Sequence, residues 1–199
     1  MILSFIIILA LSILSATLSW LYQDRERSHK ILATDFTLRT DVYYLQSDNT
    51  KVSAENYRDP QTGYYIVNIS APAAPNYAPK LRIDVRYQGI TKSYLRVYVN
   101  DMWLINNESI FKMDTVFVTA PGLWTDNRLY DKYYYYTAGE GEERGLVSGS
   151  TPQEQKTYSF ISGIQDFGRI SNGVLYLEIK ADAVQLNRME AFWGMTQLP

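Results

Sequence analysis

The stretch Leu81–Tyr87 reads Leu-Arg-Ile-Asp-Val-Arg-Tyr, with apolar and charged residues in strict alternation. Because the side chains of a strand point alternately to opposite faces, this pattern places one face on a core and the other in solvent, as in antiparallel sheets. The same period of two recurs at Phe36–Tyr44, Leu95–Val99 and Leu175–Asp182. These four stretches predict half-buried antiparallel strands and an all-β fold.

Shorter strands are predicted where β-branched and aromatic residues cluster between turn-forming residues. They are Tyr64–Ile69, Thr115–Val118, Tyr133–Tyr136 and Tyr158–Ile161. The segment Gln88–Ser93, which contains Gly89, is predicted to join two of the long strands into a hairpin. Roughly eight strands at this spacing are typical of a sandwich. We therefore expect an all-β fold behind an N-terminal hydrophobic helix, with a two-sheet β-sandwich of the jelly-roll type.

Three further stretches predict connections and one short helix. Ala71–Pro79 contains three prolines and is expected to be an extended connector or an edge rather than a central strand. Gly139–Gly149 is rich in Gly and Glu and is expected to be a solvated loop. Val184–Met195 can hold a short helix. With no internal repeat in sight, residues 36–199 are assigned to one β-sandwich domain.

The N-terminal segment predicts export. The first 23 residues carry no charged side chain. Ile2–Leu14 has the length of a signal-peptide core, and small residues follow up to Ser19, where a peptidase can cut. A retained anchor is a second hypothesis, because Ile2–Tyr22 has about the 20 residues that span a bilayer. A pilin-like apolar helix is a third hypothesis, although Phe5 stands where such helices usually carry Glu.

All three hypotheses place the remainder of the chain outside the membrane. Residues 1–19 are therefore expected to be a signal peptide or membrane-anchor helix, and residues 20–35 an extended linker or donor segment. The expected location is extracellular or at the cell surface, with membrane contact only through the N-terminal segment.

Composition excludes several classes of function. The 199 residues have a formal net charge of −2, which gives no general attraction to nucleic acid. The chain has no Cys, so disulfides, thiolate chemistry and Cys-based zinc sites are excluded. Its 17 Tyr residues favour half-buried sheet surface, where the ring packs and the hydroxyl stays in water.

The sequence offers no catalytic constellation. The only His is His29, in a charged segment after the hydrophobic stretch, so a Ser-His-Asp triad has no His beyond that position. A zinc-protease pattern needs two His residues, and no phosphate-binding glycine loop or dinucleotide fingerprint occurs. The hypothesis of a glycosidase with paired carboxylates stays open, because the pairing of two residues in space is not visible in a sequence. We predict no catalytic, cofactor-binding or metal-binding residue, no required cofactor, and no enzymatic activity.

Three patterns are compatible with binding, and each has a simpler interpretation. Glu140, Glu142 and Glu143 carry oxygen ligands suited to calcium, but their spacing matches no defined calcium loop, and a solvated acidic loop is favoured. Asn68 and Asn107 begin glycosylation sequons, for which chance occurrence is favoured. Tyr133–Tyr136 can be a carbohydrate-stacking platform, but a strand would send alternate rings to opposite faces, which favours packing.

Several patches resemble the TasA/camelysin-like secreted proteins of Gram-positive bacteria. The chain and these proteins share four features. The first two are a signal peptide followed by an aromatic and acidic stretch, and a strand that reads aromatic–aliphatic–Arg–Val. The other two are a Tyr run, and a closing strand with Ala-Val-Gln and a terminal Trp. The matching residues are Ser15–Asp24 with Phe36–Leu38, Ser93–Val99, Asp131–Tyr136 with Gly141–Glu142 and Leu146, and Leu177–Gln185 with Glu190–Gly194. The resemblance implies a jelly-roll fold, general secretion, and a role in surface fibres or biofilm matrix. Some relatives carry a protease label, which no residue here supports.

Two functional hypotheses follow, with an enzyme that uses paired carboxylates ranked third. The first is a secreted structural subunit of a cell-surface filament or biofilm matrix, a homo-oligomer assembling by strand addition through Trp20–Thr34. The second is a membrane-anchored extracytoplasmic binding or pilus-accessory module that contacts other surface proteins through Tyr-rich loops.

Overall fold

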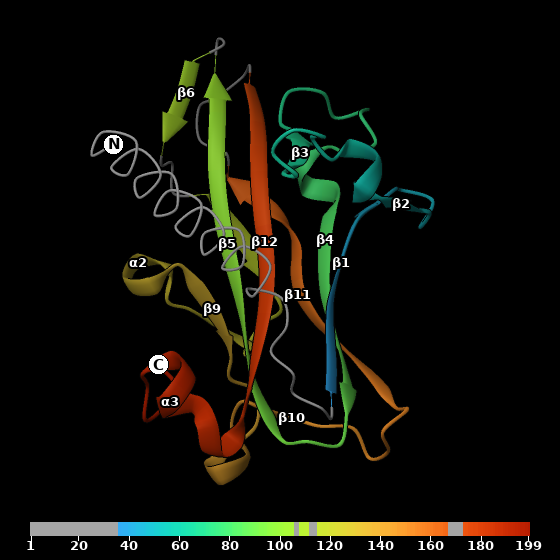
Figure 1. Ribbon diagram of the computed structural model, residues 1–199. Helices are drawn as coiled ribbons and strands as arrows, with labels where there is room; N and C mark the ends of the chain where they lie inside the picture. Colours follow the sequence, from blue (N-terminus) through green and yellow to red (C-terminus); the bar gives the residue numbers. More distant parts are fainter. Residues whose placement is uncertain (1–35, 106–107, 112–114, 167–172) are drawn as a thin grey trace, which may run out of the picture. The chain divides into compact units, whose positions relative to one another are not determined.

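Two antiparallel sheets packed face to face form the described part of the chain (Figure 1). The computed structural model describes residues 36–105, 108–111, 115–166 and 173–199. The first sheet has five strands, in the spatial order β2 (Lys51–Ser53), β1 (Phe36–Leu45), β4 (Leu81–Gly89), β11 (Gln155–Asp166) and β7 (Val116–Thr119). The predicted all-β two-sheet sandwich is confirmed.

The second sheet is centred on two strands of 13 residues each, β5 (Ser93–Ile105) and β12 (Gly173–Gln185), which pair along their whole length. Its order is β3 (Tyr65–Asn68), β12, β5, β9 (Tyr133–Tyr136) and β8 (Trp124–Asp126). The short strands β6 (Glu108–Phe111) and β10 (Leu146–Val147) also pair with β5. From β4 onward the long strands β4, β5, β11 and β12 therefore alternate between the two sheets.

The core lies between the sheets and follows the predicted alternation. In β4 the apolar residues Leu81, Ile83, Val85 and Tyr87 are wholly buried, whereas the charged residues between them face outward. Each stretch predicted to be a strand overlaps a strand of the structure. The strands that were not predicted are β2, β6, β8 and β10, which have two to four residues and are too short to show a period.

The prediction that Gln88–Ser93 closes a hairpin is wrong. This segment leaves β4 in the first sheet and enters β5 in the second. It therefore connects the two sheets, and its flanking strands do not pair with each other. The Tyr87 hydroxyl donates to the carbonyl of Thr91 at 2.5 Å and lies 3.1 Å from the Ser93 hydroxyl. Both sheets offer the same kind of apolar inner face, so alternation alone does not say which sheet a strand joins.

Helices are short and lie at the periphery. They are α2 (Arg128–Asp131), α3 (Met189–Trp193), and the 3-10 turns η1 (Ala54–Tyr57), η2 (Ala78–Lys80), η3 (Gly141–Glu143) and η4 (Leu186–Arg188). The short helix predicted within Val184–Met195 is confirmed as α3. Ala71–Pro79 is no central strand, as predicted, but it forms turns, an isolated bridge between Tyr77 and Asn68, and the start of η2 instead of an extended connector. Within the described ranges, no helix has the length and apolar character needed to cross a membrane.

Candidate functional site

One long side of the sandwich, formed by β1 and β12, has strand edges that are only partly paired among the described residues, and we call it the open side. β12 pairs with β5 along Gly173–Gln185, but with β3 only over Val174–Leu177. Beyond that point, Glu178–Gln185 has no strand partner on its outer edge among the described residues. Where β3 covers the strand, Leu175 and Leu177 are wholly buried, whereas Ile179 and Ala181, on the same inner face, are half-buried.

The first strand, β1, repeats this arrangement in the other sheet. It pairs with β4 from Phe36 to Tyr44, but with β2 only over Tyr43–Leu45. Near β2 the inward side chains of Val42 and Tyr44 are buried, whereas Phe36 and Leu38 are half-buried. In both strands burial falls next to the point where the outer neighbouring strand ends, and in β12 it rises again at Ala183, which is 7% exposed.

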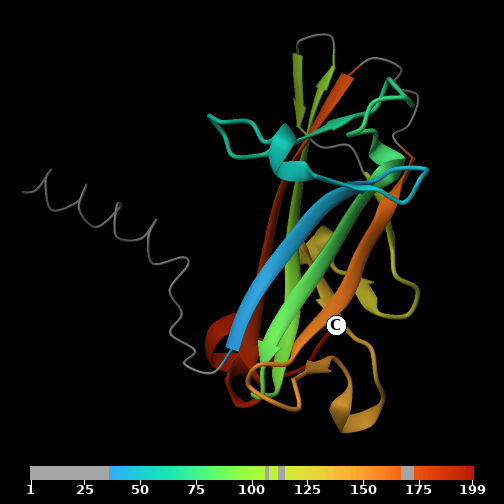
Figure 2. The same ribbon diagram turned by 90° about the vertical axis from the view of Figure 1, so that its right-hand side faces the viewer.

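The two open edges lie next to each other. β1 contacts β12 across the sandwich, and Figure 2 shows the blue β1 beside the dark red β12. On the outer faces of the two sheets, beside these edges, charged side chains form ion pairs. Asp41 pairs with Arg86, and Glu178 pairs with Lys180 at 2.6 Å. Such charges discourage unspecific pairing at an edge, but they leave its backbone donors and acceptors accessible.

The opposite long side, where β8 and β9 face β11, is filled by aromatic rings, and we call it the closed side. Trp124 of β8 donates its indole N–H to the carbonyl of Ser159 in the other sheet at 2.8 Å. Its ring centroid lies 4.7 Å from that of Phe160, which also contacts Tyr134 at 5.0 Å. Phe160 is wholly buried and Tyr134 is 1% exposed. Behind the outermost strands β7 and β8, these rings fill the space between the two sheets.

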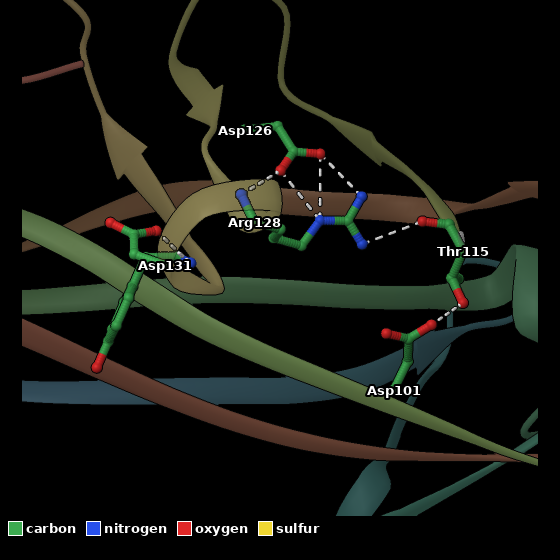
Figure 3. Close-up of polar contacts among 6 residues, drawn as sticks. Asp101, Thr115, Asp126, Arg128 and Asp131 are labelled. Atoms are coloured by element: carbon green, nitrogen blue, oxygen red, sulfur yellow. Dashed lines mark hydrogen bonds and ion pairs between the residues drawn. The ribbon is translucent and has the colours of Figure 1, made fainter. Parts of the chain in front are cut away.

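A guanidinium group fixes the outer end of the closed side (Figure 3). Arg128 of α2 donates from Nε and Nη2 to the carboxylate of Asp126 at 2.8–3.1 Å, and from Nη1 to the carbonyl of Thr115 at 3.1 Å. Its charge lies over the rings of Phe117 and Tyr134, at 5.1 and 4.8 Å. Burial disfavours the charged form of Asp126, but hydrogen bonds and charge from Arg128 prevail and hold its pKa below the ordinary value.

The same network continues into the core. The buried hydroxyl of Thr115 accepts a hydrogen bond from the Trp103 indole N–H at 3.0 Å and donates to Asp101. These groups satisfy one another, so the network ties β5, the start of β7 and α2 together. Its members all lie between Asp101 and Arg128 but follow no motif, so no sequence pattern indicated the network.

The tyrosine run forms β9, and its rings alternate as predicted. Tyr134 and Tyr136 face the core, whereas Tyr133 and Tyr135 face the outside of the second sheet. Tyr135 is nevertheless wholly buried, because its ring contacts Trp193 of α3 at 5.9 Å and its hydroxyl bonds to Asp131 and Met195. The predicted packing role therefore holds, and no row of exposed rings forms along β9.

A caged arginine lies beside Tyr133 on this outer face. The Arg96 guanidinium is 4.0 Å from the ring centroid of Tyr133 and 4.3 Å from that of Trp193. It donates from Nε and Nη2 to Asp182 at 2.9–3.0 Å, and the Trp193 indole donates to the same oxygen at 2.9 Å. These hydrogen bonds and ring contacts hold α3 on the sheet.

The other predicted candidates form no site in the described residues. Glu140, Glu142 and Glu143 are exposed, and Glu143 pairs with Lys92 at 2.6 Å. The structure groups no three His, Asp or Glu side chains within metal-binding reach in its described ranges. Asn68 accepts backbone hydrogen bonds from Ser70 and Ala71 in a turn.

Four predictions lie outside the described residues and are not addressed by the structure. They concern the segment 1–19, His29, the donor segment Trp20–Thr34 and the sequon at Asn107. Comparison with protein-family models, with curated proteins and with solved structures found no match to this chain.

Proposed function

We propose that the protein is a secreted structural subunit of a cell-surface filament or matrix, in which a segment of a neighbouring copy adds as a strand at the open side. The observation that carries this proposal is the half-buried inward stretch of β1 and of β12 that lies next to the ends of their outer neighbours. An added strand would pair with the free backbone and cover Leu38 and Ile179, the half-buried residues behind it.

The donor we propose is Trp20–Thr34 of another copy. In an extended segment, Trp20 and Tyr22 lie two residues apart and point to the same face, so both rings can enter the open side together. Ile31 and Leu32 supply further apolar surface. The charged middle, Asp24–Lys30, stays at the solvated rim.

The energetics favour a weak, repeated contact. Each ladder hydrogen bond contributes about 0.5–1.5 kcal/mol net, and each buried large apolar side chain about 1.5–3 kcal/mol. Ordering the donor costs about 1–2 kcal/mol per residue. These terms nearly cancel, so assembly should depend on protein concentration and on cooperation along a filament.

Electron microscopy and light scattering of the exported protein test the proposal. Wild-type protein should form filaments or large assemblies, and deletion of residues 20–34 should leave a folded monomer. A synthetic peptide of residues 20–34 should inhibit wild-type assembly, whereas the same peptide with scrambled sequence should not.

A matched pair of variants tests the position of the contact. Leu38→Lys puts a charge behind the open edge and should prevent assembly, because an inward charge resists a covering strand. Thr37→Lys puts the same charge on the neighbouring, exposed position and should assemble normally. If the wild-type protein stays monomeric at all concentrations, strand addition fails, and the membrane-anchored binding module becomes the better proposal.

A further inference from the structure

The outer face of the first sheet sorts its charged residues into rows that run across the strands. Figure 2 shows this face, with β1 in blue beside β4 in green and β11 in orange. Arg39 of β1 lies opposite Arg86 of β4, which in turn lies opposite Thr157 of β11, and we call these three residues the basic row. The Cβ atoms of directly opposite residues are about 5 Å apart, and like charges in such positions destabilise a sheet. The basic row therefore holds two cations side by side at a cost in stability.

The next row carries the opposite charge, and its carboxylates already have partners. Asp41 of β1 lies opposite Asp84 of β4, which lies opposite Ser159 of β11. Asp84 accepts hydrogen bonds from the hydroxyls of Tyr43 at 3.0 Å and of Ser159 at 3.1 Å. Asp41 pairs with Arg86. One carboxylate is thus left to balance the two guanidinium groups of the basic row.

The donors of the basic row are incompletely used. Arg39 is exposed, and among the described residues its side chain has no ion pair, hydrogen bond or ring contact. Thr157 is exposed as well, and within the same described ranges its hydroxyl forms no hydrogen bond. Arg86 pairs with Asp41 through Nη2, whereas its buried Nε has no acceptor there. A buried donor without an acceptor is rare in folded proteins, and a ligand that accepts from the row would account for it.

The other charges near the basic row do not neutralise it. Arg82, farther along β4, donates to two backbone carbonyls at 2.8–2.9 Å and adds a third cation to this face. Lys156 of β11 lies opposite Tyr87, on the inner side of the sheet. Glu154, directly before β11, accepts a hydrogen bond from the backbone N–H of Ser150 in its own loop. The outward charged residues of β1 and β4 are therefore three cations and two anions: Arg39, Arg82 and Arg86, and Asp41 and Asp84.

We infer that the basic row binds a phosphate group, either free or as an ester. Two guanidinium groups and a hydroxyl present donors from three adjacent strands, and the oxygens of one tetrahedral anion can accept from all of them. A carboxylate has only two oxygens and matches a single guanidinium group. The Nε of Arg86 is covered, so it donates to the anion when the guanidinium turns away from Asp41. This binding goes beyond the proposed function, because the row lies on the outer face and the added strand covers inward residues.

Calorimetric titration of the full-length exported protein tests the inference with inorganic phosphate and with dimethyl phosphate, a simple diester. Saturable binding of both shows that the group is recognised in either form, and binding of one alone supports the inference and identifies the form. Acetate should bind at least about tenfold more weakly, because it offers fewer acceptors. Binding of neither phosphate compound, or binding of acetate as tight as that of phosphate, would overturn the inference.

A matched pair of arginine variants locates the site. Arg39→Gln should weaken phosphate binding at least about tenfold, since it removes a charged donor. Arg82→Gln removes the same charge from the same face, but Arg82 lies four positions along β4 from Arg86, about 13 Å away. At that distance surface charges are screened, so Arg82→Gln should bind nearly as the wild type does. Equal losses in the two variants would indicate general attraction of anions and overturn the inference.

A third variant distinguishes binding from a structural role of the ion pair. Asp41→Asn frees the guanidinium of Arg86 and should strengthen phosphate binding about threefold or more, because the anion no longer competes with a carboxylate. If the pair serves only to hold β1 on β4, the variant loses stability in urea and gains no affinity. A folded Asp41→Asn protein that binds phosphate no better than the wild type therefore contradicts the inference. Filaments formed by a protein that binds no phosphate refute this inference alone and leave the proposed function standing.

Discussion

The open and closed sides of the sandwich use the same alternation of apolar and polar residues, yet they are buried to different extents. On the closed side Phe160 is wholly buried beneath Trp124 and Tyr134. On the open side Leu38 and Ile179 are half-buried, although they occupy equivalent inward positions. The difference comes from lateral neighbours, because an inward side chain is covered by the next strand as well as by the facing sheet.

The two sides also differ in the contacts that connect the two sheets. Indole and guanidinium groups cross between elements on the closed side, where Trp124 bonds to Ser159 and Arg128 to Thr115. On the open side the Tyr44 hydroxyl of β1 donates to the carbonyl of Ile66 in β3 at 3.1 Å, at the end that the outer strands cover. The inward residues beside the unpaired edges, Leu38 and Ile179 among them, are apolar. An edge backed by apolar side chains can accept a strand more readily than an edge whose polar groups are committed to partners.

The largest expected effect separates the two sides by truncation. Phe160→Ala should lower the free energy of unfolding by about 3–5 kcal/mol, because it leaves a cavity among fixed rings. Leu38→Ala should lower it by only about 1 kcal/mol, since the side chain is half-buried and transfers less surface. Urea unfolding of both variants measures the difference.

Equal losses in the two variants would contradict the comparison and indicate that the open side is fully packed in solution. The truncation should be measured at low protein concentration, because assembly would stabilise the folded state and mask the effect.

An intermediate effect is expected from the guanidinium that fixes the closed side. Arg128→Ala should cost about 1–3 kcal/mol, because the Thr115 carbonyl loses its donor and Asp126 loses its partner. Arg128→Lys keeps the charge without the planar fork and should cost less. Chemical denaturation of the two variants gives the ranking.

The pH dependence of the same pair provides the control. The depressed pKa of Asp126 contributes stability above about pH 4, its ordinary value, and this contribution is lost as the pH falls through the depressed pKa. In Arg128→Ala the pKa of Asp126, followed by NMR, should rise. An unchanged pKa would show that Arg128 does not hold this carboxylate.

The smallest effect concerns buried tyrosines at alkaline pH. Burial raises the pKa of Tyr135 and Tyr158 to about 12, with the Asp131 hydrogen bond adding to the shift of Tyr135. Their neutral forms are favoured in the folded state, so their stability contribution is complete below pH 10 and is lost as the pH rises through 12. Each should account for about 1 kcal/mol after allowance for solvent screening.

Absorbance at the tyrosinate band tests this prediction against the protein in urea, where all tyrosines should titrate near pH 10. Tyr135→Phe should remove the part of the alkaline destabilisation that comes from this ring on the outer face of the second sheet. A native titration curve that coincides with the curve in urea would show that these rings are not protected.

The candidate site could be predicted only in part. The alternation in Leu175–Asp182 predicted an inward face, and the change along it from Leu to Ala was a visible sign of a thinner core. The sequence did not show that β3 stops at Leu177, because a strand's neighbour is set by another part of the chain. The basic row was missed because its residues come from three strands, and a sequence does not show the register between strands.

By itself the sequence determined the fold class, the inward and outward residues of the long strands, and the lack of cysteine chemistry. Those properties are local, since the period of two depends only on neighbouring residues. Only the tertiary structure decided that β4 and β5 belong to different sheets and that α3 buries Tyr135. It also decided that Arg96 meets Asp182, 86 residues away. Such pairings depend on which of several equivalent apolar faces meet, and this is a property of the packed chain rather than of any one segment.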